Sequence, residues 1–447
     1  MNNTMNNKTV KRIAFFIIFL TFLSIYSAIV RHVVYNEKND LGVIESAVNY
    51  FSKFPFMVKT VLLSDEFNRI PPTYVKMDTT FKEINKLNYN LYGMNSFFNN
   101  KSRRWEIELF NLKNDSVIYN WQIKREDYYK TRRQYPNAAP RGTILLPDKS
   151  IIVLLVESNN LLRLDSLSNI IWHNTQKYFH HTMNLSVDSN IWVCSSSYQP
   201  IKNSNQPEPK YYIDDYLTKV DINSGEIILE KSVSELLIEN NLKHFIFRCA
   251  NEGLGSTDQD PLHLNDIEVT YHQSSNYNIG DLFLSFRHRS AIIQYRPSKN
   301  KVIRIINGPF LNQHDVDIIS ENEISLFDNN VISFGTENPD TILINTMSND
   351  PIEFFPSYIV KYNFITEKYS LFSPNIFEAE KITTLTQGLH EFLSNGDVFV
   401  ESQNEGKIYI LNEKEIKLKK YFKTNIEGMV HQPHWIRIYE NIDFLNN

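Results

Sequence analysis

The chain has 447 residues, a formal net charge of −5, 13% aromatic residues and two cysteines. This length suffices for a large hydrophobic core, and the negative charge excludes a protein that attracts nucleic acid through a basic surface. The cysteines, Cys194 and Cys249, are too few for a cysteine-based zinc site or a disulfide scaffold, although one bridge and two separate buried thiols both fit the sequence.

The N-terminus carries an apolar segment behind a short basic one. Residues 1–12 end in Lys8, Lys11 and Arg12, and residues 13–30 contain no charged side chain. This run reaches the length of a membrane-spanning helix and exceeds the apolar stretch of about 7–15 residues in a cleaved signal. We therefore expect a cytoplasmic N-terminus over 1–12 and an uncleaved transmembrane anchor over 13–30. Because basic flanks stay in the cytoplasm, the remaining chain is expected in the periplasm or outside the cell.

Residues 31–100 are expected to connect the anchor to the main domain. Apolar residues recur at helical spacing over 40–64, which predicts a short juxtamembrane helix or stalk. Pro71 and its neighbour Pro72 interrupt this pattern. The mixed, Asn-rich residues 73–100 are expected to form a linker.

From residue 101 to the C-terminus, short alternating runs of apolar residues are broken by Asn, Gly and Asp, which is typical of β-hairpins. A first hairpin is expected from Trp105. Five units of similar pattern then begin near residues 141, 180, 263, 314 and 390. The segment around Trp435 supplies a final strand, which could complete the blade begun at Trp105 and so remove a free sheet edge.

These units recur at intervals close to the roughly 40–50 residues of one four-stranded blade, with insertions. The sequence therefore predicts an all-β fold, a six-bladed β-propeller over 101–447, preceded by the transmembrane helix and the short helical stalk. Polar insertions near 196–212, 250–262 and 331–356 are expected as loops on one rim, where propellers carry substrate contacts.

Four of the repeat units carry a histidine at an equivalent position. These are His181, His263, His314 and His390, at intervals of 82, 51 and 76 residues. Because the innermost strand of each blade lines the channel, the pattern predicts four imidazoles around one axial pocket. A neutral imidazole can act as a nucleophile or pass a proton, and Arg287, one strand outward, offers a planar set of donors to an oxyanion. This combination predicts group transfer from an ester of a strong acid.

Three motifs resemble those of the bacterial arylsulfate sulfotransferase family: Leu262-His263-Leu264-Asn265, Ser285-Phe286-Arg287-His288 and Gln313-His314-Asp315. The resemblance extends over roughly residues 140–440. It implies a periplasmic six-bladed propeller that moves a sulfuryl group from an aryl sulfate to a phenolic or other hydroxyl acceptor through a sulfohistidine. It also implies that neither the nucleotide sulfate donor nor a cofactor is used. Asp266 departs from the family, which has Ser at this place.

The resemblance also implies roles for individual residues. His314 would be the nucleophile, and His263 and Arg287 would hold the sulfuryl oxygens and assist proton transfer. His181 matches the remaining family histidine, although the preceding His180 could face the pocket instead.

Three further side chains, Asn265, His390 and His180, are assigned to substrate binding. No metal ligand is assigned, because no carboxylate is clearly placed with the histidines. Two other functions also fit the sequence. A histidine cluster could bind Zn, Fe or Mn and support a metal-dependent lyase or hydrolase, and a non-catalytic propeller at the cell surface could bind an anionic glycan or a protein partner. An oligomer is compatible with the sequence.

Overall fold

The computed structural model describes residues 7–30, 74–99, 101–102, 104–124, 139–156, 158–197, 201–202, 211–247, 260–331, 356–424 and 426–446. The chain divides into two compact units, Met1–Ile70 and Pro71–Asn447. The expected stalk over 40–64, Cys249 and most of the expected rim loops lie outside the described residues. Cys194 is a buried free thiol.

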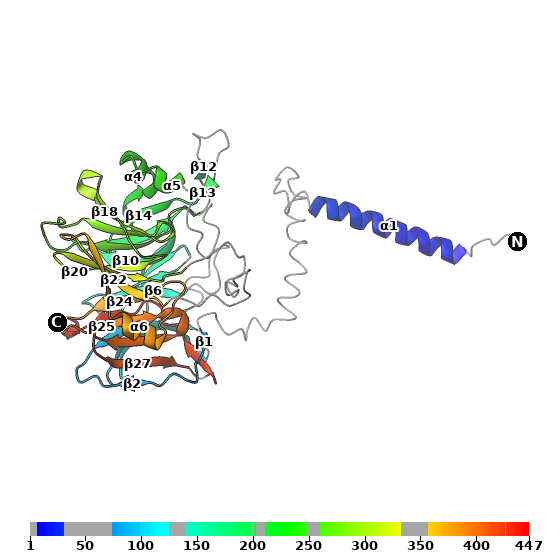
Figure 1. Cartoon of the computed structure of the whole chain (residues 1–447). Coiled ribbons are helices and arrows are strands. Elements are labelled where there is room, and N and C mark those ends of the chain that lie inside the picture. Colours follow the sequence, from blue (N-terminus) through cyan, green and yellow to red (C-terminus); the bar gives the residue numbers. More distant parts are fainter. Residues whose placement is uncertain are drawn as a thin grey trace, which may run out of the picture. The chain divides into compact units, whose positions relative to one another are not determined.

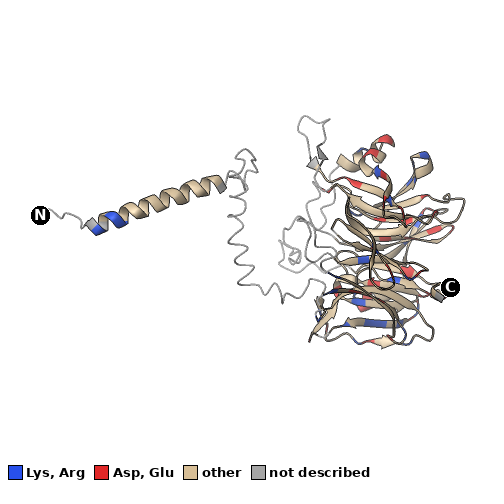
Figure 2. Ribbon diagram, turned by 180° about the vertical axis from the view of Figure 1, so that it is seen from behind, with Lys and Arg blue, Asp and Glu red and all other residues tan. Residues whose placement is uncertain are grey.

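In the first unit, the apolar N-terminal segment forms helix α1 (Asn7–Val30) (Figure 1). Its sequence contains neither Gly nor Pro, so nothing interrupts the backbone hydrogen bonds. The stretch Val10–Ile29 has a mean hydropathy of 2.0 and is fully exposed. By length and composition it can cross a membrane, and an N-terminal signal sequence would have the same character. The basic side chains gather at the N-terminal end of the helix (Figure 2).

The second unit is an all-β propeller in which antiparallel sheets follow one another around an axis (Figure 1). Four of its sheets each consist of four strands that follow one another along the chain.
The first of these blades contains β6 (Pro140–Leu145), β7 (Ile151–Leu155), β8 (Asn160–Leu164) and β9 (Ile170–Asn174). The second contains β10 (Tyr178–Leu185), β11 (Ile191–Ser196), β14 (Asp215–Val220) and β15 (Ile227–Ser232). The third contains β16 (Leu264–Val269), β17 (Leu282–Phe286), β18 (Ala291–Arg296) and β19 (Lys301–Asn307). The fourth contains β20 (His314–Ser320), β21 (Glu323–Asp328), β22 (Tyr358–Asn363) and β23 (Lys368–Phe372).

The fifth four-stranded blade joins the two ends of the propeller sequence. It consists of β29 (Arg437–Tyr439), β3 (Tyr92–Asn99), β4 (Arg104–Asn111) and β5 (Val117–Ile123). Ile438 pairs with Gly93, and Tyr439 pairs with Tyr92. The expectation that the C-terminal strand completes the blade containing Trp105 is confirmed. The blade itself begins earlier than expected, because β3 lies inside the segment 73–100 that was interpreted as a linker.

The remaining sheet has seven strands. They are β24 (Leu389–Phe392), β25 (Val398–Ser402), β26 (Lys407–Leu411), β27 (Ile416–Lys423), β28 (Met429–His431), β1 (Tyr74–Lys76) and β2 (Ile84–Asn85). The described residues thus form five regular four-stranded blades rather than the predicted six, and the unit from His390 belongs to this larger sheet. The sheet is larger because β1 pairs with β28 and β2 with β27 instead of remaining in a linker.

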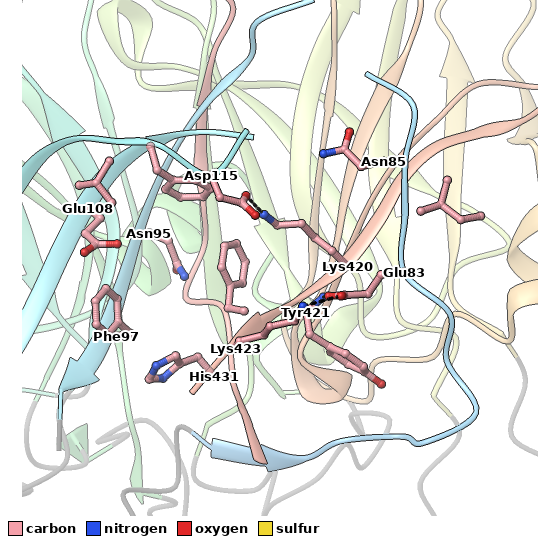
Figure 3. A pocket seen from close by; sticks show the side chains of 14 residues that line it. Glu83, Asn85, Asn95, Phe97, Glu108, Asp115, Lys420, Tyr421, Lys423 and His431 are labelled. Carbon is pink, nitrogen blue, oxygen red and sulfur yellow. Dashed lines mark hydrogen bonds and ion pairs between the residues drawn. The ribbon is translucent and has the colours of Figure 1, made fainter. Parts of the chain in front are cut away.

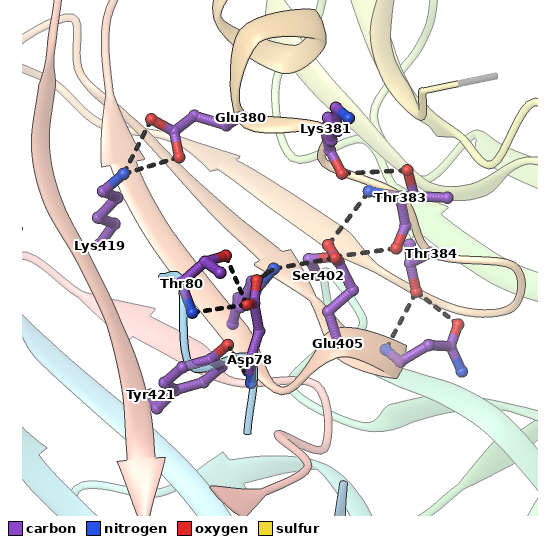
Figure 4. Close-up of polar contacts among 12 residues, drawn as sticks. Asp78, Thr80, Glu380, Lys381, Thr383, Thr384, Ser402, Glu405, Lys419 and Tyr421 are labelled. Carbon is purple, nitrogen blue, oxygen red and sulfur yellow. Dashed lines mark hydrogen bonds and ion pairs between the residues drawn. The ribbon is translucent and has the colours of Figure 1, made fainter. Parts of the chain in front are cut away.

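Polar contacts fasten the segment after β1 to the seven-stranded sheet (Figure 4). The backbone N–H of Asp78 donates to the hydroxyl of Tyr421 over 3.2 Å, and the Asp78 carboxylate accepts the backbone N–H of Thr80 over 2.9 Å. On the same sheet, Lys419 forms a 2.8 Å ion pair with Glu380. The contact between Asp78 and Thr80 is exposed, whereas Tyr421 is buried and the side chains of Lys419 and Glu380 are only 11% and 22% exposed.

The described residues form six hydrophobic clusters, and each lies between two neighbouring sheets. One contains Trp105 and Trp121 of the fifth blade with Leu162 of the first. Another joins Phe327 of the fourth blade to Tyr409 of the seven-stranded sheet. Each large side chain buried in this way stabilises the fold by about 1.5–3 kcal/mol, and together the clusters hold the sheets in a closed ring.

Short helices and one additional strand pair complete the described structure. They are α4 (Val233–Glu239), α5 (His244–Phe247), α6 (Pro374–Glu380), the 3₁₀ helices η2 (Arg287–Arg289), η3 (Pro297–Lys299), η4 (Gln403–Glu405) and η5 (Asp443–Asn446), and the pair β12 (Ile201–Lys202) and β13 (Tyr211–Tyr212). Lys and Arg residues are interspersed with Asp and Glu residues over the sheets (Figure 2).

The first strands of the blades lie nearest to the axis, where β10 contacts β6 and β16, and β16 contacts β20. Each of these four strands contains a bulge near its start. A bulge places two residues opposite one and turns the side chains beside it in a new direction. By contrast, β24 pairs regularly with β25 along its whole length. The bulges near the starts of β6, β10, β16 and β20, and the absence of one from β24, therefore determine which side chains meet in the channel.

Candidate active site

A cluster of imidazoles lies at the upstream ends of β10, β16 and β20. His181 is at its centre, with its Nδ1 2.8 Å from Nδ1 of His180 and its Nε2 3.2 Å from Nε2 of His263. The ring centroid of His314 lies 6.2 Å from that of His181. The structure thus brings together three of the four repeat histidines and adds His180 to them.

The backbone that presents these side chains is strained. His181 and His263 have φ values of 54° and 56°, and Asp315, which follows His314, has a φ of 54°. This left-handed region is sparsely populated by residues other than glycine and costs about 1–3 kcal/mol for each. His181 and Asp315 lie within the bulges of β10 and β20, and His263 lies immediately before β16 and its bulge. The strain is therefore the local cost of aiming three imidazoles at one place.

His314 is held in one tautomer. Its Nδ1 lies 2.6 Å from Oδ1 of Asn329. The amide nitrogen of Asn329 donates to the carbonyls of Thr384 and Gln387 over 2.9 and 2.6 Å, which fixes the orientation of the amide. Since Oδ1 can only accept a hydrogen bond, Nδ1 of His314 must carry the hydrogen, and its Nε2 therefore bears a lone pair. Burial, together with the charge of Arg287, lowers the pKa of His314 to about 3, so this ring is neutral at physiological pH.

Arg287 supplies a buried positive charge beside the imidazoles. Its side chain follows β17, and only 3% of the residue is exposed. Nη1 donates to Nε2 of His288 over 2.9 Å, whereas Nη2 is buried and has no hydrogen-bond partner within the described part of the chain. Burial lowers the pKa of Arg287 to about 10, so the group stays charged at neutral pH. A charged donor without a partner is suited to an anionic ligand.

Asp260 orients two of the histidines. Its carboxylate accepts a hydrogen bond from Nδ1 of His263 over 2.5 Å, and its backbone carbonyl accepts one from Nδ1 of His288 over 2.7 Å. His263 therefore directs the lone pair of Nε2 towards His181. Burial, followed by the charges of His288 and Arg287, lowers the pKa of His263 well below its usual value.

The donor and acceptor of each hydrogen bond can be assigned from His263 through His181 to His180. Because Nε2 of His263 accepts, Nε2 of His181 must donate, and Nδ1 of His181 then accepts from Nδ1 of His180. Nε2 of His180 lies 3.4 Å from the carboxylate of Asp215. Burial lowers the pKa of His180, but the contact with Asp215 outweighs burial and the net shift is upward. The arrangement is a chain of imidazoles that begins at His180, beside Asp215, and ends at His263.

The structure places Asn265 and His390 outside this cluster. Asn265 is fully buried and donates to the backbone carbonyl of Gln313 over 2.7 Å, so it supports the start of β20. His390 lies against Asp315 and Ser325, with its Nε2 2.7 Å from the Ser325 hydroxyl. The expectation of four imidazoles around one pocket is therefore wrong for His390. The physical reason is that β24 has no bulge to turn this side chain towards the others.

Two groups of side chains have the geometry of metal ligands, with ligand atoms within 4.8 Å of one another. They are Asp260, His263 and His288, and Asp315, Asp317 and His390. In the first group, both ring nitrogens of His288 already make hydrogen bonds, and one of these comes from the Arg287 guanidinium. A cation so close to a donor atom disfavours a metal ion there. The second group has no such neighbour and belongs to the acidic part of the channel.

A cavity of about 310 Å³ lies between the inner strands on the acidic side of the channel. Its lining includes five carboxylates, those of Asp266, Glu268, Asp315, Asp317 and Glu391. Burial raises the pKa of Asp266 to about 7, and Asp315 adds to the shift. The carboxylate that replaces the family's Ser does not face the imidazoles: Asp266 accepts the backbone N–H of Val316 over 2.8 Å and so joins β16 to β20.

A second cavity, of about 490 Å³, lies where the seven-stranded sheet meets the blade of β3 and β4 (Figure 3). Lys420 pairs with Asp115 and Lys423 with Glu83 in its lining, which also includes the ring of Phe97. None of the residues that the sequence predicts to be functional lines this cavity, and its two lysines are already paired with Asp115 and Glu83.

The sequence did not point to several residues that orient the cluster. Asn329, Asp260 and Asp215 were given no role. Each is a polar residue close to a strand end, which is a common position for turn residues. Only the three-dimensional pairing with His314, His263 and His180 distinguishes them.

Comparisons with known proteins give one match to a family and several to solved structures. A sequence model of the family described as arylsulfotransferase (ASST) matches residues 142–418. No curated protein matches the chain. A protein of unknown function from Bacteroides caccae shares 8% identity with a TM-score of 0.46, covering 78% of this chain and 97% of its own. A virginiamycin B lyase from Staphylococcus aureus shares 11% identity with a TM-score of 0.35, covering 64% and 71%. A streptogramin B lyase shares 11% identity with a TM-score of 0.38, covering 80% and 90%.

Proposed function

The chain belongs to the arylsulfotransferase (ASST) family, and on that premise we propose that it transfers a sulfuryl group from an aryl sulfate to a phenolic or other hydroxyl acceptor. The reaction proceeds through a sulfohistidine and uses no nucleotide sulfate donor. The single observation that supports this mechanism best is the contact between His314 and Asn329. It leaves Nε2 of His314 with a lone pair in a water-poor site.

In the first step, Nε2 of His314 attacks the sulfur of the donor. A nitrogen–sulfur bond forms while the bond between sulfur and the aryl oxygen breaks, and its electron pair leaves with that oxygen. The low pKa of His314 keeps the nucleophile neutral and ready at physiological pH. Arg287 binds the peripheral sulfuryl oxygens through the Nη2 donor that lacks a protein partner.

The leaving phenolate takes the proton that lies between Nε2 of His181 and Nε2 of His263. An anionic donor in the pocket opposes the effect of burial on the histidine pKa values and favours a charged imidazole. His180 supplies that proton through His181, along hydrogen bonds of 2.8 and 3.2 Å that already point in the required direction. The phenol then leaves, and the sulfuryl group remains on His314.

In the second step, the oxygen of the acceptor attacks the same sulfur. Its proton passes to His263 and returns along the imidazole chain, while the nitrogen–sulfur bond breaks and its electron pair returns to His314. Donor and acceptor therefore use one site in turn, which requires ping-pong kinetics.

The finer arrangement of the protein is part of this proposal. The seven-stranded sheet acts as the sixth blade, because hydrophobic clusters join it to the blades on either side. Helix α1 anchors the chain in a membrane as an uncleaved segment, and the propeller lies outside the cytoplasm, since Lys8, Lys11 and Arg12 precede the apolar stretch.

The proposal is tested with the purified full-length chain, an aryl sulfate donor and a panel of phenols. Initial rates at several fixed acceptor concentrations should give parallel double-reciprocal lines, and product formation should need no nucleotide. Lines that intersect to the left of the axis would show that both substrates bind together, and the two-step route would then be wrong.

A further inference from the structure

Away from the imidazole cluster, the described lining of the channel carries more carboxylates than basic side chains. Five carboxylates line the cavity of about 310 Å³, and Arg437 is the one Lys or Arg among the described residues that line it. Arg437 donates to the backbone carbonyls of Gly142 and Met183, so its hydrogen bonds go to the main chain of β6 and β10. Charges gathered in this way between packed strands repel one another unless a proton or a cation separates them.

A buried imidazole points into the same place. Only 1% of His390 is exposed, and its Nε2 is already bonded to Ser325. Its Nδ1 is buried and makes no hydrogen bond within the described residues, even though a carboxylate oxygen of Asp315 lies 2.9 Å away. Oδ2 of Asp317, 3.6 Å from Nε2 of the same ring, is also buried without a hydrogen-bond partner. An unpaired ring nitrogen of His390 and an unpaired carboxylate oxygen of Asp317 thus belong to neighbouring side chains.

The unbonded Nδ1 of His390 and the nearby carboxylates have the spacing of ligands to one ion. Two ligand atoms that each lie about 2.1 Å from a metal, at roughly 90–110° to one another, are about 3.0–3.4 Å apart. The 2.9 Å separation joins Nδ1 of His390 to Asp315, close to this range, and one ligand atom from each of the three side chains lies within 4.8 Å of the others. The ligands come from two neighbouring inner strands, β20 and β24.

We propose that Asp315, Asp317 and His390 bind one divalent transition-metal ion, of the class of Mn²⁺ or Zn²⁺. A mixed imidazole and carboxylate set suits these ions better than Mg²⁺ or Ca²⁺, which prefer oxygen alone. Glu268 and Glu391 lie in the same cavity and balance the charge of the ion. This inference does not depend on sulfuryl transfer, because the ion is held apart from the imidazole cluster.

The ion would stabilise the strand that carries His314. Asp315 is the bulged residue after His314 and has a φ of 54°. Its carboxylate also accepts the backbone N–H of His390 over 2.6 Å. A metal held between Asp315 and His390 would join β20 to β24 directly below the strained turn. The site is therefore a structural support for the fold of the channel, and its loss should lower thermal stability.

The test measures metal binding by the full-length chain rather than activity. The protein is treated with EDTA, desalted, incubated with MnCl₂ or ZnCl₂, desalted again and analysed for bound metal and melting temperature. We expect about one ion per chain and a higher melting temperature. Asp317→Asn and His390→Gln should each weaken binding by roughly 10–100-fold or more, a loss seen even for the outer partners of metal ligands.

Asp260→Asn is the matched control, because it changes the other group of three possible ligands and should leave the stoichiometry unchanged. Glu391→Gln, outside the ligand set, should weaken binding only a few-fold and serves if the ligand variants do not fold. The inference is overturned if the wild type retains neither ion, if Asp317→Asn and His390→Gln bind as the wild type does, or if Asp260→Asn abolishes binding. Retention of Ca²⁺ alone would overturn the assignment to a transition metal.

Discussion

Oδ1 of Asn329 lies 2.6 Å from Nδ1 of His314, and two backbone carbonyls hold the amide of Asn329 in the orientation that this contact requires. The pair explains how an imidazole with 1% exposure can present a lone pair in a defined direction. Loss of Asn329 would free the ring to rotate or to change tautomer. The effect of this change on catalysis can be measured separately from any loss of the folded structure.

Asn329→Ala should lower kcat by about 10²-fold, the size expected when a reacting group is misplaced by about 1 Å. KM for the donor should change little, because Asn329 contacts the imidazole rather than the substrate. Asn329→Asp should recover part of the rate, since a carboxylate also accepts from Nδ1, and it should raise the pKa of His314. A pH–rate profile of Asn329→Asp that coincides with that of the wild type would show that the contact has no influence on the nucleophile.

Arg287→Ala should lower kcat by about 10²–10³-fold, the usual cost of losing one donor to an oxyanion. Arg287→Lys should recover only part of this loss, because an ammonium lacks the planar set of donors. Arg304→Ala, at a partly exposed position on β19, is the control and should leave the rate unchanged. Full activity in Arg287→Ala would remove this side chain from the site.

His180→Gln should interrupt the proton chain that ends at His263. The loss in rate should be larger for donors whose phenols are weak acids, because their leaving oxygen needs the proton most. Donors with strongly acidic phenols should be transferred almost as fast as by the wild type. His272→Gln, at an exposed position, is the matched control. The same loss for every donor would contradict a role in proton supply.

The buried imidazole of His314 predicts a pH-dependent difference in stability. Burial lowers its pKa from 6.5 to about 3, so between these values the unfolded state binds more protons than the folded state. The contribution of neutral His314 to stability is thus fully present above pH 6.5 and is lost as the pH falls towards 3. Relative to the wild type, His314→Gln should gain about 2 kcal/mol between pH 7 and pH 5.

Unfolding by urea at both pH values measures that difference. The carboxylates with raised pKa, such as Asp266, change their protonation in both proteins and cancel in the comparison. A difference between His314→Gln and the wild type that does not vary with pH would show that His314 is not buried as a neutral group.

Much of the propeller could be predicted from the local sequence pattern, but its irregular strands could not. The alternation around Trp435 was enough to predict the strand that pairs with β3. The strand β3 itself was missed, because Gly93 and Asn95 give it the composition of a turn. The strand β1 was also missed, since its pairing with β28 depends on residues far away in the chain.

The residues of the candidate site could likewise be predicted only in part from the sequence. The repeat of His181, His263 and His314 could be seen in the sequence because these residues lie near the starts of equivalent strands. The different position of His390 could not, because a bulge is a property of strand pairing and leaves no mark in the hydrophobic pattern. Asn329 was likewise hidden, since it is 15 residues from the histidine that it orients.

The most direct test of the account is the mass of His314 after incubation with an aryl sulfate in the absence of acceptor. The account predicts one acid-labile sulfuryl group on His314, which disappears when a phenol is added, and it predicts that His314→Ala forms no adduct and releases no phenol from the donor. A sulfuryl group found on another residue, or wild-type transfer by His314→Ala, would contradict it.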